Sequence, residues 1–410
     1  MSDSIFRPYL ERRNTIVRNK NILQTSYVPD QLPHRSEQID QVASVVAAAL
    51  KGDKPSNLMI FGKTGTGKTA VMNFIGNELK KADSSSGHCE FVYINCEVVD
   101  THYGILYTIG NQNQADFDKR IPYTGWSTEK VFAEMRSYID SQNKVFIIVL
   151  DEVDKLLDKS SEDVLYHLLV INEGLINSKV SLVGISNKLT FMEFLDPRVR
   201  SRLGEEKMVF PPYNSKQLED ILKERAKLAF DDGSIEEGVI PYCAALSAQE
   251  TGDARRALNL LRVAADIAER NGDTVVTEAH VKSAKNKIEM DTIIEAVKTL
   301  TPQSKTVLMS IMKNTENGNK TMTTGDVYST YKDISQILGT GTVTQRRVTD
   351  LISELDMLGI IHARVRSFGR AGRTKEIELS APKEVVDVLE NDDIMRPLKT
   401  YRPPKQTTLM

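Results

Sequence analysis

The sequence predicts an α/β domain built on a parallel sheet, then an all-helical segment, and then a small domain of helices and a β-ribbon. From Leu58 to Phe210, apolar strand-like runs alternate with helical stretches, which is the pattern of a parallel sheet covered by helices. From Tyr213 to about Met290 the apolar residues recur at helical spacing only. A further change near Asp291 introduces helices followed by two strand-like runs around a glycine-rich tip.

Length and composition fit this organisation. The chain has 410 residues, enough for two or three domains. We place the α/β domain at residues 1–212, the helical lid at 213–290, the C-terminal domain at 291–395 and a flexible tail at 396–410. The sequence has no apolar run of roughly 18 residues and no apolar signal core, and its three cysteines lack metal-ligand spacing. We therefore expect a cytoplasmic protein with no membrane segment.

The expected elements follow from apolar spacing and caps. Ser36 caps a helix that runs to Leu50. The parallel strands are expected at Leu58–Phe61, Phe91–Asn95, Val145–Leu150, Val180–Ser186 and Lys207–Phe210. The helical segment has apolar helical spacing over Leu218–Phe230, Val239–Gln249 and Ala254–Arg270.

The first strand leads into the segment G-x-x-x-x-G-K-T, which ends at Lys68 and Thr69. This is the pattern of a phosphate-binding loop, in which glycines allow backbone N–H groups to surround phosphates and a helix N-terminus faces the anion. Lys68 supplies a positive charge and Thr69 a hydroxyl for Mg²⁺. The sequence therefore predicts a site for ATP or ADP with Mg²⁺. Its phosphate contacts are Gly62, Gly65, Thr66, Gly67, Lys68 and Thr69.

Two polar strand ends complete the predicted ATPase site. Asp151 and Glu152 end a fully apolar strand 83 residues after Lys68. We expect Asp151 to help hold Mg²⁺, usually through water, and Glu152 to polarise the attacking water. Asn187 ends the next strand and is expected to hydrogen-bond that water or the γ-phosphate, although asparagine at a strand end is also common in turns.

Arginines follow at two places where a γ-phosphate could be reached. Arg198, Arg200 and Arg202 form a ridge that is either a solvated surface or an arginine finger for a neighbouring subunit, with Arg202 the first choice. Arg255, with Arg256 as its rival, opens a lid helix and is expected to fold over the nucleotide.

The hinge between sheet and lid is expected to border the nucleotide base. Tyr213 follows two prolines at this junction, and Arg225 lies about three turns along the next helix on the same side. We predict that both line the adenine pocket. The alternative is ordinary packing of the lid.

The C-terminal domain carries a helix-turn-helix pattern. Helices are expected at Asp326–Ile337 and Val343–Leu358, joined by a glycine turn, and Ile360–Arg366 and Thr374–Leu379 form the ribbon. Residues 339–375 hold seven Lys/Arg and three Asp/Glu, a local charge of 7 − 3 = +4 in a chain of net charge −3. We therefore predict DNA contacts, with protein contact as the alternative. The expected DNA-binding residues are Arg346, Arg347, Arg364, Arg366, Arg370, Arg373 and Lys375.

The order of these motifs resembles the AAA+ ATPases, and most closely the archaeal replication initiators related to the eukaryotic origin-recognition and cell-division-cycle initiator subunits. The resemblance rests on the segments Leu32–Arg35, Asp196–Val199, Phe210–Tyr213 and Gly252–Leu258. It implies a AAA+ parallel-sheet ATPase domain with an all-α lid, followed by a winged-helix domain. It also supports Gly65, Thr66, Gly67, Lys68, Thr69, Tyr213 and Arg225 as ATP contacts.

The same resemblance implies partners. Double-stranded origin DNA would bind the winged helix and a helical insertion near Tyr103–Met135, which contains Lys119, Arg120 and Trp126. The ATP-bound form would recruit the replicative helicase, and other initiator subunits are possible partners.

We therefore predict a replication initiator with a slow or partner-stimulated ATPase, located in the cytoplasm at the nucleoid. One alternative is a nucleotide-gated winged-helix transcription regulator. Another is a clamp-loader-like assembly factor, against which the basic C-terminal domain argues.

Overall fold

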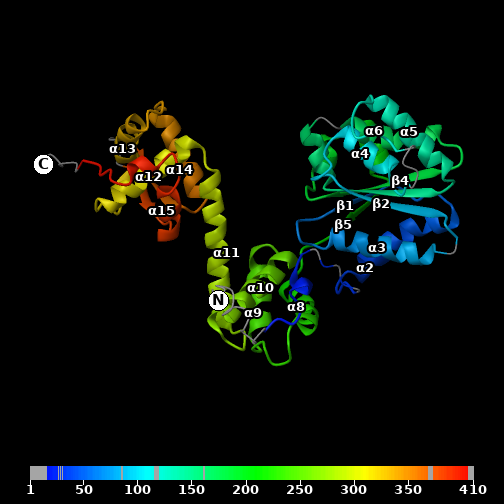
Figure 1. Ribbon diagram of the computed structural model, residues 1–410, viewed down its shortest axis with the longest axis horizontal. Coiled ribbons are helices and arrows are strands. Elements are labelled where there is room, and N and C mark those ends of the chain that lie inside the picture. The colour runs from blue at the N-terminus through cyan, green and yellow to red at the C-terminus, as the bar shows by residue number, and fades with distance from the viewer. Residues whose placement is uncertain are drawn as a thin grey trace, which may run out of the picture. The chain divides into compact units, whose positions relative to one another are not determined.

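The computed structural model describes residues 16–25, 27, 29, 31–84, 86–114, 120–159, 162–367 and 373–404. The chain divides into two compact units, Met1–Ala284 and Lys285–Met410, which are described separately below. Figure 1 labels most of their helices and several of their strands.

The first unit is built on a parallel sheet whose strand order, within the described residues, is β2-β3-β4-β1-β5. β3 is buried at every position, which explains its unbroken apolar sequence. The predicted strands and parallel fold class are confirmed. The strands are β1 (Leu58–Phe61), β2 (Cys89–Asn95), β3 (Val145–Asp151), β4 (Lys179–Ser186) and β5 (Glu206–Val209).

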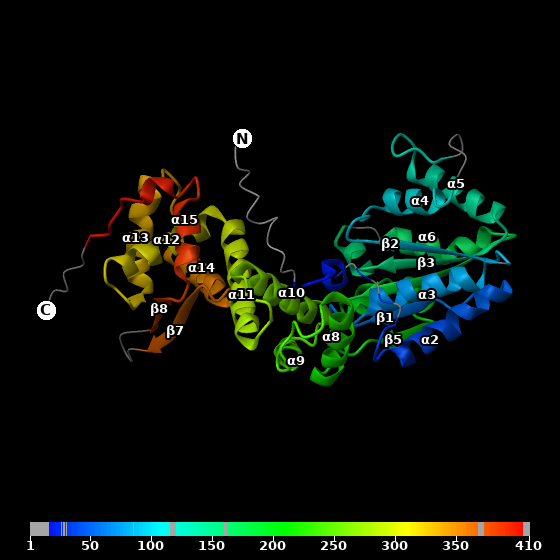
Figure 2. The same cartoon turned by 60° about the horizontal axis from the view of Figure 1, so that its bottom comes forward.

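Helices cover both faces of this sheet (Figure 2). On one face α2 (Ser36–Val46) and α3 (Lys68–Ala82) pack against alternate residues of the strands. The other face carries α4 (His102–Gly110), α5 (Thr128–Ser141), α6 (Glu162–Val170) and α7 (Pro197–Leu203).

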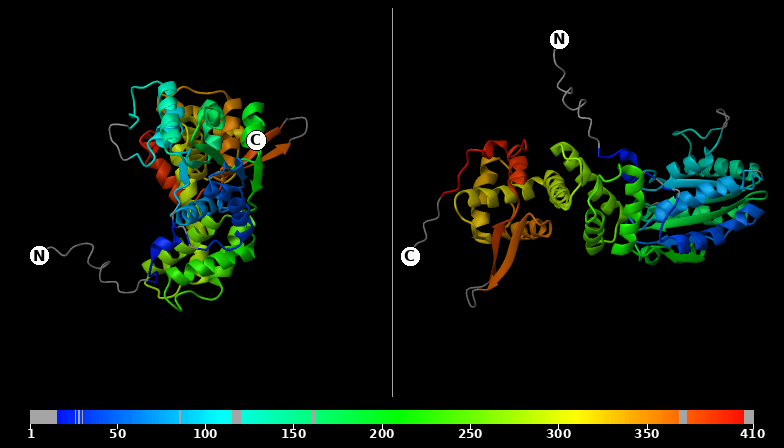
Figure 3. Two further views of the ribbon diagram at one scale, coloured as in Figure 1. Left: turned by 90° about the vertical axis from the view of Figure 1, so that its right-hand side faces the viewer. Right: turned by 90° about the horizontal axis from the view of Figure 1, so that it is seen from below.

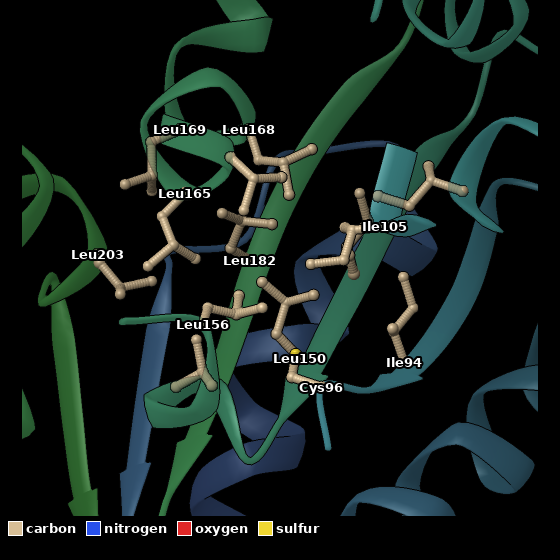
Figure 4. Packing of buried hydrophobic residues seen from close by; sticks show 14 of the residues in the cluster. Ile94, Cys96, Ile105, Leu150, Leu156, Leu165, Leu168, Leu169, Leu182 and Leu203 are labelled. Atoms are coloured by element: carbon tan, nitrogen blue, oxygen red, sulfur yellow. The ribbon is translucent and has the colours of Figure 1, made fainter. Parts of the chain in front are cut away.

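Leucine and isoleucine side chains fill the layer beneath α4 and α6. Figure 4 shows Leu182 of β4 close to Leu165 and Leu168 of α6. This packing fixes the carboxyl ends of β1, β3 and β4, where the polar residues of the site are attached. Short 3₁₀ helices connect the elements at Lys20–Leu23, Ala47–Lys51, Val153–Lys159, Ile171–Gly174 and Phe191–Phe194.

A helical lid follows the sheet. It contains α8 (Ser215–Ala229), α9 (Val239–Glu250) and α10 (Ala254–Asn271). The first described residues, which we had placed with the α/β domain, pack on this lid: Val17 bridges to Phe230, and its N–H donates to Oε1 of Glu269 at 3.2 Å. The long helix α11 (Glu278–Thr299) begins in the first unit and ends in the second.

The second unit is a winged-helix domain, as predicted. Its described strands form an antiparallel sheet in the order β6-β8-β7, and the β7–β8 ribbon extends away from the helices (Figure 3). Gly339 has a φ of 63°, as the glycine turn between α13 and α14 requires. The elements are α12 (Pro302–Glu316), β6 (Met322–Thr323), α13 (Thr324–Ile337), α14 (Gln345–Met357), β7 (Ile361–Ser367), β8 (Arg373–Leu379), α15 (Lys383–Glu390) and a 3₁₀ turn at Arg396–Leu398.

Residues 396–404 were predicted to form a flexible tail, but they pack on the winged-helix domain. Leu398 is completely buried in the winged-helix core. Asn317 Nδ2 donates to the carbonyl of Pro403 at 2.9 Å. The prolines suggested a loose end, but the apolar residues between them dock on the domain; residues 405–410 lie outside the described part. No helix within the described residues is long and apolar enough to cross a membrane.

Candidate functional site

The glycine-rich loop joins β1 to α3 in a conformation that other residues would strain. Gly65 and Gly67 have φ values of 72° and 90°, in the left-handed region. A Cβ atom on Gly65 would also lie 1.6 Å from Oδ1 of Asp253 in the lid. The loop therefore has the open backbone and close approach that a phosphate cradle needs.

Lys68 lies inside this cradle and is only 6% exposed. Its Nζ donates to the carbonyls of Gly62 and Lys63 at 2.7 and 2.9 Å and to Oδ1 of Asn187 at 2.8 Å. Burial lowers the pKa of Lys68 to about 8, because desolvation disfavours the ammonium. A buried ammonium held by neutral oxygens suits an incoming phosphate, and Asn187 lies where the sequence predicted.

The Asp151 carboxylate is 4% exposed and fully engaged by neighbours. Its Oδ2 accepts from Thr69 Oγ1 and from the hydroxyl of Tyr93, both at 2.6 Å. Its Oδ1 accepts from the backbone N–H of Glu152 at 2.9 Å. Thr69 and Asp151 are therefore adjacent, as residues that share one Mg²⁺ must be.

Glu152 follows in an unusual backbone conformation. Its φ is 54°, a left-handed value that costs a non-glycine residue about 1–2 kcal/mol. Burial raises the pKa of its carboxyl, and the nearby charges of Glu97 and Asp151 add to this. A strained carboxylate of increased basicity beside the phosphate loop has the properties of a general base.

The lid closes over the phosphate loop through the N-terminus of α10. The N–H of Ala254 donates to the carbonyl of Gly65 at 3.2 Å, and Arg255 lines the same small cavity as Lys68, Asp151, Glu152 and Asn187. The rival arginine, Arg256, forms an ion pair with Glu250 instead.

A cavity of about 200 Å³ adjoins the phosphate loop, where Gly65, Gly67 and Thr69 form part of its wall. Tyr213 lines it. Arg225 also lines it but directs its guanidinium to the N-terminal segment: it donates to the carbonyls of Ile22 and Tyr27 at 3.2 and 3.3 Å and lies 4.5 Å above the Tyr27 ring. Arg225 thus holds the wall of the pocket, which Gln24, Thr25, Tyr27 and Leu32 help to form.

Arg35 is a site residue that the motif analysis missed. It is 1% exposed, and it donates to the carbonyls of Thr66 and Pro211 at 2.9 and 2.7 Å. Its guanidinium carbon lies 3.8 Å from the centre of the Tyr213 ring. One side chain therefore joins the phosphate loop to the hinge. In the sequence, the one indication of a role for Arg35 was its place in the Leu32–Arg35 segment that supports the family resemblance.

The structure does not bring the arginine ridge to this pocket within one chain. Arg202 pairs with Glu173 at 2.9 Å, and Arg198 bonds to Asp196 and lies over the Tyr166 ring. Neither is among the described residues that line the cavity around Lys68.

In the second unit most of the predicted DNA-binding residues are exposed. Arg346 and Arg347 begin α14, and Arg364 and Arg366 lie on β7. Arg347 pairs with Glu354 at 3.2 Å and Arg366 with Glu376 at 2.9 Å. Lys375 instead bonds to Ser353 of α14 and joins ribbon to helix. Arg370 and the side chain of Arg373 lie outside the described residues.

The expected insertion near Tyr103–Met135 consists of most of α4, a connecting segment and the first half of α5. Trp126 packs partly against the sheet core, and Lys130 Nζ lies 3.8 Å from its ring centre. Arg120 donates to the carbonyl of Gln114 at 3.0 and 3.1 Å. Lys119 lies outside the described residues.

These features define a AAA+ ATPase: a phosphate loop after β1, a carboxylate pair at the end of β3 and a helical lid that closes over the loop. In this chain the ATPase is joined to a winged-helix domain. Residues 58–211 match the family of ATPases associated with various cellular activities (AAA). Residues 219–286 match the Cdc6 AAA+ ATPase-type lid domain, and residues 295–388 match the CDC6 C-terminal winged helix domain.

Similar proteins and a similar solved structure show to which family of AAA+ ATPases the chain belongs. The chain is 50% identical over 404 residues to ORC1-type DNA replication protein 1 of Methanosarcina mazei, covering 98% of this chain and 96% of the relative. It is 50% identical over 408 residues to the ORC1-type DNA replication protein of Thermococcus kodakarensis, covering 99% and 98%. Among solved structures, the Aeropyrum pernix ORC1 protein in complex with DNA matches with a TM-score of 0.76 and 44% identity, over 94% of this chain and 99% of that one. The chain belongs to the ORC1-type family of DNA replication initiators, so the resemblance drawn from its motifs is confirmed.

Proposed function

We propose that this protein binds double-stranded origin DNA under the control of ATP and, in its ATP-bound form, helps to recruit the replicative helicase. The observation that carries the proposal is a complete phosphate pocket closed by Arg255 of the lid, in the same chain as a winged helix with exposed arginines. A lid that contacts the phosphate loop can respond to whether a γ-phosphate is present.

The roles of the pocket residues follow from their chemistry. Lys68 and Arg255 bind the phosphates, and Asn187 and Glu152 orient water, with Glu152 accepting its proton. Asp151 and Thr69 would hold Mg²⁺, whose contribution is to neutralise charge on the phosphate oxygens.

Turnover by a single chain is proposed to be slow. The candidate finger, Arg202, and its alternative, Arg198, pair on the surface with residues of their own chain. Hydrolysis would then depend on another initiator subunit that supplies an arginine, and it would act as a timer for the bound state.

The DNA contacts are proposed at the start of α14, at the β7–β8 ribbon and in the Tyr103–Met135 segment. Arg346 and Arg364 are exposed and can reach phosphates or base edges. The Aeropyrum pernix relative, which matches along nearly the whole chain, was solved in complex with DNA. Binding to origin DNA would place the protein at the nucleoid.

Footprinting on genomic fragments, with ATP and with ADP, tests this function. We expect protection at the replication origin, with an affinity that differs between the two nucleotides. Protection confined to promoters would favour a transcription regulator. Equal affinity for all fragments in both nucleotide states would contradict the proposal.

A further inference from the structure

Tyr93 lies on β2, outside every motif that predicts the nucleotide site, yet its side chain reaches the centre of that site. Its hydroxyl donates to Oδ2 of Asp151 at 2.6 Å. Thr69 Oγ1 donates to the same oxygen at 2.6 Å, and the N–H of Glu152 donates to Oδ1 at 2.9 Å. These groups therefore hold the carboxylate: a side chain of β2, a side chain of α3 and the backbone N–H of the next residue.

The sheet register explains how Tyr93 reaches Asp151. β2 and β3 are parallel neighbours, and Asn95 pairs with Asp151. Tyr93 precedes Asn95 by two residues, so its side chain points to the same face of the sheet as that of Asp151. A tyrosine is long enough to cross the remaining distance diagonally and to end in a donor.

We propose that Tyr93 is a positioning residue for Mg²⁺: its hydroxyl fixes the Asp151 carboxylate in the orientation that receives the cation of a bound nucleotide. The inference rests on the proposed function, which assigns Asp151 and Thr69 to the cation. Thr69 turns its hydroxyl to the metal in phosphate-loop proteins, so with the cation bound the Tyr93 hydroxyl would remain as the side-chain donor to Oδ2 of Asp151.

The size of the effect follows from general properties of metal ligands. Groups that hydrogen-bond a ligating carboxylate orient it, and their loss commonly weakens metal binding by about 10–100-fold. Because Asp151 is only 4% exposed, water has little access to replace a lost donor. A phenylalanine at position 93 would keep the ring and leave Oδ2 with one donor fewer.

The test is Tyr93→Phe, with two binding measurements on the full-length protein. ADP affinity is measured in EDTA, and Mn²⁺ affinity of the ADP complex is measured by electron paramagnetic resonance. We expect ADP affinity in EDTA within about twofold of wild type and Mn²⁺ affinity lowered by about 10–100-fold. A purely structural role of Tyr93 would change the metal-free affinity as well.

The matched control is Tyr138→Phe, which removes a tyrosine hydroxyl that donates to the carbonyl of Gln112, in the same domain. It is expected to leave both affinities unchanged. Unchanged Mn²⁺ affinity in Tyr93→Phe, or an equal loss of ADP affinity without metal, would overturn the inference.

The same data separate this inference from the proposed function. Wild-type protein that binds no ADP would contradict both. Wild-type protein that binds ADP but gains no Mn²⁺ site would leave nucleotide binding standing and overturn the roles of Asp151 and Tyr93.

Discussion

The nucleotide pocket and the winged helix use charged residues in opposite ways. In the pocket Lys68 and Arg35 are 6% and 1% exposed, and each hydrogen-bonds to oxygens of its own chain. On the winged helix Arg346 and Arg364 are exposed, and Arg347 pairs with Glu354 at the surface. Removing one partner of a buried charged contact destabilises the fold strongly, because the other group is left buried without a partner. An exposed charge contributes little to stability, and salt weakens its interactions.

This contrast separates two proposed tasks: the pocket responds to the bound nucleotide, and the winged helix binds DNA. The pocket must respond to one phosphate group, so its donors are fixed before the ligand arrives. A DNA surface must bind an extended row of phosphates, so its arginines can remain separate and solvated. The predictions below run from the largest expected effect to the smallest.

The strongest effect is expected for Glu152→Gln, because it removes the proton acceptor and keeps the shape of the side chain. ATP turnover should fall by about 10²–10⁴-fold, and ATP affinity should change little. Turnover is measured as phosphate release with any partner subunit present, and Glu78→Gln, which removes a surface carboxylate that pairs with Lys81, is the control. Wild-type turnover in Glu152→Gln would refute its role.

Arg35→Met should destabilise the first unit, because it removes the donor to the buried carbonyl of Thr66 and to the partly buried carbonyl of Pro211. The expected loss is about 2–4 kcal/mol in the free energy of unfolding, from roughly 1–3 kcal/mol for the unsatisfied Thr66 carbonyl and about 1 kcal/mol for the lost bond to Pro211. Urea unfolding measures it. Arg202→Met removes an exposed ion pair with Glu173 and should cost about 1 kcal/mol or less. Equal costs would remove the contrast between buried and surface arginines.

The affinity of the pocket for ADP should depend on pH above about 8. The pKa of Lys68 is lowered to about 8 in the free protein, and a bound phosphate favours the ammonium, so binding takes up a proton at higher pH. Affinity should be flat below pH 8 and then fall by up to about tenfold per pH unit. Calorimetry in buffers of different ionisation enthalpy measures the proton uptake. Absence of uptake at pH 9 would contradict the assignment.

On the winged helix, single arginine substitutions should have modest effects that depend on salt. Arg346→Ala and Arg364→Ala should each reduce the slope of log K against log salt by about 1 if the residue contacts a phosphate. The same is expected for Arg370→Ala and Arg373→Ala at the tip. Lys375→Ala, which loses a bond to α14, should change the slope less. An unchanged slope in all four arginine variants would count against this surface.

The sequence predicted features whose residues lie in continuous segments. Lys68 and Thr69 begin α3 directly after the phosphate loop, Asp151 ends β3 and Asn187 follows β4, so a parallel sheet necessarily brings them together. The strands and the helices of the lid and of the C-terminal domain follow from periodicity for the same reason, whereas the winged-helix assignment came from the family resemblance.

Residues that act across the fold could not be predicted in this way. Arg35 bonds to Pro211, 176 positions away, and Tyr93 to Asp151, 58 positions away. Both partnerships depend on side-chain direction in the packed structure. The prediction of a flexible tail was wrong as far as Pro404. It gave more weight to the proline content than to the apolar Leu398, which is buried in the winged-helix core.

The central claim is that the phosphate loop holds an adenine nucleotide through Lys68. Its most direct test is a calorimetric titration of the purified protein, freed of any bound nucleotide, with ATP in millimolar Mg²⁺, alongside Lys68→Ala. The account predicts one site per chain in the wild type and no measurable binding in the variant. Wild-type protein that takes up no nucleotide, or a variant that binds equally well, would contradict it.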